Sequence, residues 1–143
     1  MAYVDRSHYD VYLAVCYPDI DYPEWPVHWI ILLHNPGSER CTYFHSATED
    51  GGYRYLQEPD KRFDSWGIET MDFLARIPAS EFATVQREAL AVPAQSCQCW
   101  SSYLIFRLQR LGLVPDGTYE HWRDYHMTSR RLDLGPGGCS CFY

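Results

Sequence analysis

Residues 27–46, VHWIILLHNPGSERCTYFHS, decide the fold of this chain. Two runs rich in β-branched and aromatic residues, 27–33 and 41–46, flank a turn at 34–40 that contains the triplet Asn-Pro-Gly. Strand-forming runs on either side of such a turn predict an antiparallel β-hairpin.

The predicted hairpin carries two histidines, His28 and His45. If it is symmetric about Pro36-Gly37, His28 lies directly opposite His45 and Ile30 lies opposite Tyr43. Opposed residues share one face of a sheet, so the two imidazoles are expected to converge on one point. The alternative is that each histidine is an ordinary hydrogen-bonded residue of the sheet, which is the common case for a single histidine.

A second informative stretch is QSCQCWSSYLIFRL, residues 95–108, which predicts a helix that begins at Cys97 and ends before Gly112. One apolar stripe of this helix should face the sheet, and it consists of positions 97, 101, 104, 108 and 111. Cys97 heads the stripe, where free backbone amides and the positive end of the helix dipole favour a thiolate. Cys99 lies about 200° further round the helix and is expected to be structural.

The rest of the chain predicts a single α+β domain over 1–143, with a small antiparallel sheet packed against the cysteine-bearing helix. The other expected elements are strands over 9–17 and 68–75, helices over 80–91 (capped by Ser80) and 116–126, and a polar loop over 48–64 with at most a short strand at 53–56.

Composition excludes several classes of function. The net charge of −7 disfavours nucleic acid and anionic membrane surfaces as partners. No apolar run reaches the roughly 18 residues that a membrane span needs. The N-terminus lacks a secretory signal pattern, so we expect a cytoplasmic protein whose six cysteines are thiols.

Metal and cofactor motifs are not evident. Cys97-x-Cys99 and Cys139-x-Cys141 could together hold zinc, but zinc sites usually place two to four residues between paired cysteines. No glycine-rich phosphate loop or calcium loop occurs. We therefore expect neither a metal nor a cofactor.

A cysteine at a helix start beside a histidine on a sheet is typical of thiol acyl-transfer enzymes. Cys97 would be the nucleophile, His28 the general base and His45 the group that orients His28. Two other functions stay open: a binding module that keeps the fold without turnover, and an enzyme that uses the same pocket for cyclisation or isomerisation.

The motifs His28-Trp29-Ile30-Ile31-Leu32, Tyr43-Phe44-His45 and Ser96-Cys97-Gln98-Cys99-Trp100 follow one another in an order that resembles a known family. They are similar to those of the circularly permuted NlpC-type branch of the papain fold, above all its lecithin:retinol acyltransferase-like group. The last motif also resembles a fungal type whose helix begins Cys-Gln-x-Trp.

The resemblance covers roughly residues 9–112 and implies a permuted papain-like fold with a Cys97-His28-His45 triad. It implies an amidase, thioesterase, peptidase or acyltransferase acting on an acyl or peptidyl small molecule. Ser96 replaces the frequent Asn, and the chain lacks a C-terminal membrane anchor, so we do not expect a membrane phospholipid as substrate. We expect substrate contacts from five residues: Trp29, Tyr43, Gln98, Trp25 and Trp66.

Overall fold

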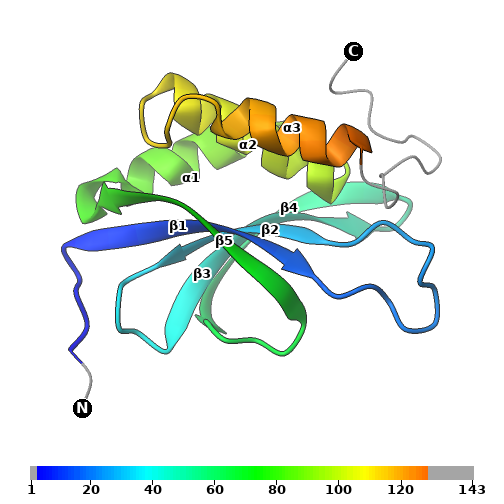
Figure 1. Cartoon of the computed structure of the whole chain (residues 1–143), viewed down its shortest axis with the longest axis horizontal. Coiled ribbons are helices and arrows are strands. Elements are labelled where there is room, and N and C mark those ends of the chain that lie inside the picture. Colours follow the sequence, from blue (N-terminus) through cyan, green and yellow to red (C-terminus); the bar gives the residue numbers. More distant parts are fainter. Residues whose placement is uncertain (1–2, 129–143) are drawn as a thin grey trace.

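Five antiparallel strands form one sheet in the order β4-β3-β2-β1-β5, and three helices follow them in the chain (Figure 1). The computed structural model describes residues 3–128. The strands are β1 (His8–Cys16), β2 (Trp29–His34), β3 (Arg40–Glu49), β4 (Gly52–Arg62) and β5 (Ile68–Pro78). The helices are α1 (Phe82–Ala91), α2 (Cys97–Arg110) and α3 (Thr118–Thr128), and a 3-10 turn at Ala79–Glu81 precedes α1.

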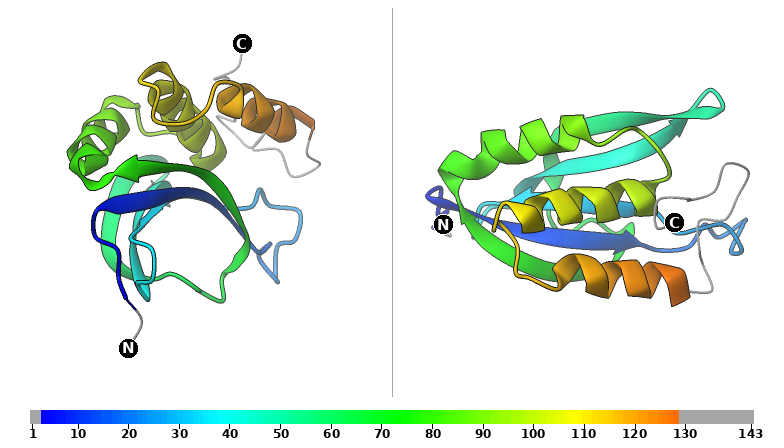
Figure 2. Two further views of the ribbon diagram at one scale, coloured as in Figure 1. Left: turned by 60° about the vertical axis from the view of Figure 1, so that its left-hand side comes forward. Right: turned by 90° about the horizontal axis from the view of Figure 1, so that it is seen from above.

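The three helices cover one face of a strongly curved sheet (Figure 2). The main core lies between the two layers and includes Trp29, Ile31 and Leu33 of β2, whose side chains are at most 1 % exposed. The opposite face carries a second, smaller apolar cluster that includes Ile30 and Leu32. Side chains of a strand alternate between faces, so β2, apolar from Trp29 to Leu33, is buried on both sides. The expected α+β class with a small antiparallel sheet is confirmed.

The hairpin of β2 and β3 forms as expected, but its register was predicted wrongly. Tyr43 pairs with Leu32 rather than with Ile30, a shift of two residues. The turn is centred between Gly37 and Ser38, one residue later than expected. Two hydrogen bonds tie it to the N-terminal segment: Asp5 N–H donates to the Pro36 carbonyl at 2.8 Å, and Asn35 Nδ2 donates to the His8 carbonyl at 2.8 Å. A shift by an even number keeps every side chain on its expected face.

The polar stretch expected to form a loop is instead β4, an eleven-residue strand at the edge of the sheet. The sequence of β4 resembles that of a loop because an edge strand bears charged residues and faces solvent along one side. A tight turn at Asp50 and Gly51, both with positive φ, joins β3 to β4.

The helices agree more closely with expectation. α2 begins at Cys97, and the chain turns at Gly112 (φ +75°), where the Leu113 amide bonds the Leu108 carbonyl at 2.9 Å. Ser80 does not cap α1, which begins at Phe82 after the 3-10 turn. Among the described residues, none of the helices has both the length and the apolar character needed to cross a bilayer.

Gly37 offers a test of the N-terminal segment's role in setting the hairpin turn. At φ +90°, a Cβ on Gly37 would lie 2.1 Å from the Tyr3 carbonyl oxygen, whereas one on Gly117 (φ +92°) meets nothing within 4 Å. We expect Gly117→Ala to lower the free energy of unfolding by about 1 kcal/mol through backbone strain alone. Gly37→Ala should lower it by roughly 2 to 3 kcal/mol because the N-terminal segment must also move. Equal losses in urea unfolding would show that this contact does not hold the turn.

Candidate active site

Two imidazoles meet across the hairpin. His28 Nε2 lies 2.7 Å from His45 Nδ1, and the ring centroids are 4.9 Å apart in an edge-on arrangement. His28 directly precedes β2 and His45 lies in β3, so the observed register makes them diagonal rather than opposite neighbours. The two rings are long enough to span the diagonal. The two imidazoles therefore converge as expected, although the strand register differs from the expected one.

Glu58 extends this pair and was missed from the sequence. Its Oε1 lies 2.6 Å from His45 Nε2, so the three side chains form the chain His28-His45-Glu58. A bulge between β3 and β4 lies beside it: Cys41 pairs with Lys61, but Tyr43 pairs with Glu58. The extra residue lets Glu58 and Lys61 share a face although their numbers differ by three. Recognition of β4 as a strand would have pointed to Glu58, because the register runs without a shift from the turn to the pair of Tyr43 and Glu58.

The carboxylate determines which ring nitrogens carry protons. Glu58 can only accept when ionised, so His45 donates to it from Nε2–H. In a neutral His45, Nδ1 is then an acceptor, and His28 Nε2–H donates to it. This assignment leaves a lone pair on His28 Nδ1, the atom that a general base requires.

The pKa values in this chain fit a neutral His28. Burial, with a smaller contribution from His45, lowers the pKa of His28 from 6.5 to about 4, and Glu58 opposes the change. The hydrogen bond from His45 lowers the pKa of Glu58 below its usual value. At neutral pH the site thus contains an ionised Glu58 and a neutral His28.

Cys97, the first residue of α2, shares a pocket with His28. The pocket encloses about 440 Å³ and is lined by Trp25, Pro26, His28, Ser46, Ala47, Thr48, Tyr53 and Cys97. Cys97 Sγ lies 3.7 Å from the carbonyl oxygen of Val27, the residue before His28. Gln98 Nε2 donates to the same carbonyl at 3.0 Å. These two bonds tie the start of α2 to the segment that carries His28.

The other cysteines differ from Cys97 in state and surroundings. Cys99 is fully buried and disulfide-bonded, so the expectation that all cysteines are thiols was wrong, and the argument for a reducing compartment loses its support. Cys139 and Cys141, the other half of the zinc site considered above, lie outside the described residues. Cys16 and Cys41 are free thiols, and burial raises their pKa to about 11 and about 12. Among the described cysteines, Cys97 alone lines this pocket, and it is not disulfide-bonded.

The five residues expected to contact substrate fall into three groups. Trp25 lines the pocket. Gln98 and Tyr43 are buried close to the site: Gln98 supports Val27, and the Tyr43 ring lies 6.2 Å from that of His45. Trp29 and Trp66 do not line the pocket.

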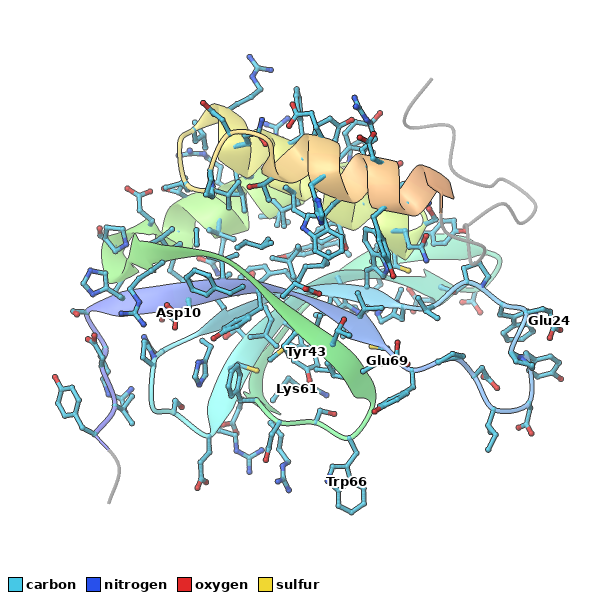
Figure 3. All side chains as sticks on the ribbon, viewed as in Figure 1. Asp10, Glu24, Tyr43, Lys61, Trp66 and Glu69 are labelled. Carbon is cyan, nitrogen blue, oxygen red and sulfur yellow. The ribbon has the colours of Figure 1, made fainter. Side chains whose placement is uncertain are left out.

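Trp29 belongs to the main core, 1 % exposed and packed edge-on against Trp122, because odd-numbered residues of β2 face the helices. Trp66 is 91 % exposed in the loop between β4 and β5 and does not line this pocket. Figure 3 shows Trp66 on the side of the sheet away from the helices, beyond Tyr43 and Lys61. A strand's phase and a loop's direction depend on tertiary structure, so neither position could be read from the sequence.

Metal binding finds no support in the described part of the chain, where no three His, Cys, Asp or Glu side chains converge on a common point. His28, His45 and Glu58 form a line of hydrogen bonds with one another.

Three comparisons with known proteins give no match: no family model, no curated protein and no solved structure is similar to this chain. The function therefore has to be argued from the site itself.

The pKa of His28 predicts how stability depends on pH. The unfolded chain takes up this proton near pH 6.5, whereas the folded state resists it down to about pH 4. The unfolded state thus binds more protons in this window, and the free energy of unfolding falls as pH is lowered through it, by up to about 3 kcal/mol. Urea unfolding between pH 7 and pH 5 should show a smaller fall for His28→Gln. Parallel curves for the two proteins would mean that His28 titrates normally.

Proposed function

We propose that this chain is a cysteine-dependent acyl-transfer enzyme that works through a thioester on Cys97, with His28 as general base. The observation that carries the proposal is one pocket lined both by a cysteine in its thiol form at a helix start and by a histidine held in a defined tautomer. Neither feature alone points to catalysis, but their combination is the arrangement that nucleophilic acyl transfer requires.

The reaction would proceed in two steps. The Cys97 thiol gives its proton to His28 Nδ1 as sulfur attacks the substrate carbonyl, and His28 returns that proton to the leaving group as the carbon–heteroatom bond breaks. Water or an acceptor then attacks the thioester and gives its proton to His28, the carbon–sulfur bond breaks, and His28 returns the proton to the released Cys97 thiolate. Backbone amides at the start of α2 lie next to the sulfur and would stabilise the oxyanion.

The resting state would be a neutral pair rather than an ion pair. Two features support this view: the low pKa of His28, and the Val27 carbonyl that accepts from the Cys97 thiol. Both favour the protonated thiol against the effect of the helix dipole. Proton transfer would then accompany attack on the substrate.

A permuted papain-like fold is consistent with this proposal. The chain order of the strand that follows His28, the hairpin partner with His45 and the helix that begins with Cys97 is the order in that family. The proposed site nevertheless has a fourth member, because Glu58 orients His45 as His45 orients His28.

Cys97 should be the reactive thiol. Iodoacetamide at neutral pH is expected to label Cys97 much faster than Cys16 or Cys41, whose pKa values are raised by burial. Peptide mass spectrometry over a time course measures the three rates. Cys97→Ser should abolish turnover of activated acyl esters, thioesters or short peptides while leaving the urea midpoint nearly unchanged. A Cys97 rate no faster than that of Cys16, or full turnover by Cys97→Ser, contradicts the proposal.

Glu58 should act as a positioning residue. Glu58→Gln keeps the shape but removes the charge, so turnover should fall by roughly tenfold to a hundredfold. Because Glu58 raises the pKa of His28, the acid limb of the pH–rate profile should also move to lower pH. Glu49→Gln, which changes a carboxylate paired only with exposed Arg54, is the matched control. A lower rate with an unmoved acid limb would show a purely structural role.

A further inference from the structure

The loop between β1 and β2 forms one wall of the Cys97 pocket and carries an ordered pair of aromatic rings. Tyr22 and Trp25 stack with centroids 4.0 Å apart and planes 8° from parallel. The Trp25 amide donates to the Tyr22 carbonyl at 3.0 Å, and Asp19 Oδ1 accepts from the Tyr22 amide at 3.2 Å. Prolines at 18, 23 and 26 restrict the same loop. The pair is therefore held in place before any ligand binds.

Part of the surface of this aromatic pair stays uncovered by the rest of the protein. Tyr22 covers one face of the Trp25 indole, yet Trp25 remains 51 % exposed and lines the pocket together with Cys97. Tyr53 of β4, which is 37 % exposed, lines the pocket as well. A flat ring could thus lie against Trp25 within a short distance of the thiol.

The charge around the pocket restricts the ligand further. None of its described lining residues is Lys or Arg, and burial lowers the pKa of its one histidine to about 4, so that ring is neutral at pH 7. The loop carries three carboxylates close to the aromatic pair in sequence: Asp19 and Asp21 precede Tyr22, and Glu24 lies between Tyr22 and Trp25. Glu24 projects from this loop at the end of the molecule where β1 leaves the sheet (Figure 3). The nearest cation along β4, Arg54, is paired with Glu49 at 3.0 Å.

We infer that Trp25, backed by Tyr22, is a stacking subsite for a flat aromatic group of the substrate that is uncharged or cationic. This inference rests on the proposed function for its link to Cys97, and it narrows the substrate class. Aromatic stacking favours any flat ring, and a cation gains further from the π-face and from the neighbouring carboxylates. An anionic group near the ring meets those carboxylates without a compensating cation.

The test measures binding without turnover. Full-length Cys97→Ser is titrated calorimetrically with four probes of similar size: N-acetyl-phenylalanine amide, N-acetyl-cyclohexylalanine amide, phenylalanine amide and N-acetyl-phenylalanine. We expect the neutral aromatic amide to bind roughly three- to tenfold more tightly than its cyclohexyl analogue. Cationic phenylalanine amide should bind at least as tightly, and the anionic N-acetyl-phenylalanine should bind most weakly.

Two variants locate the effect. Trp25→Leu in the same background should abolish the preference for the aromatic ring, whereas Trp66→Leu, which removes an exposed tryptophan outside the pocket, should leave it intact. Equal binding of the aromatic and cyclohexyl probes, tightest binding of the anion, a preference that survives Trp25→Leu, or no binding of any probe would each overturn the inference. If the preference holds but Cys97 proves unreactive in the wild type, the proposed function fails and the subsite stands.

Discussion

The hydrogen bond between His28 and His45, at 2.7 Å, is the contact on which the rest of the site depends. It forms only because the β2–β3 register places the two rings diagonally on the same face and because Glu58 fixes the tautomer of His45. One carboxylate at the edge of the sheet thereby determines which nitrogen of His28 keeps its lone pair, and in the proposed mechanism this nitrogen is the base. Burial keeps that nitrogen unprotonated at neutral pH.

The second constraint is the way α2 meets the sheet. The carbonyl of Val27 accepts bonds from both Cys97 and Gln98, so the first turn of the helix is tied to the residue that precedes the base. The proposed nucleophile and base come from parts of the chain about seventy residues apart, and the Val27 carbonyl links the two segments. The buried face of α2 supports this arrangement through Trp100, Leu104 and Leu108 of the main core. The packing of α2 in the main core thus helps to position the Cys97 thiol.

The sequence predicted the fold class, the hairpin and the first residue of α2, because each has a local signal: alternating or continuous apolar runs, a proline and glycine turn, a helical stripe. It also placed His28 and His45 on one face, since an even register shift does not change faces. It missed what depends on distant contacts. The turn contacts the N-terminal segment, β4 is a polar strand at the edge of the sheet, and Glu58 reaches the site from that strand. Trp29 and Trp66 were misplaced for the same reason.

The most direct test of this account is the protonation state of the His28 ring at pH 7, measured by long-range ¹H–¹⁵N NMR on the full-length protein. The account predicts a neutral ring with the proton on Nε2 and a lone pair on Nδ1, and a change in the Nδ1 signal when Cys97 is alkylated. A ring protonated on Nδ1, whether neutral or cationic, would leave Cys97 without a base and would contradict the account.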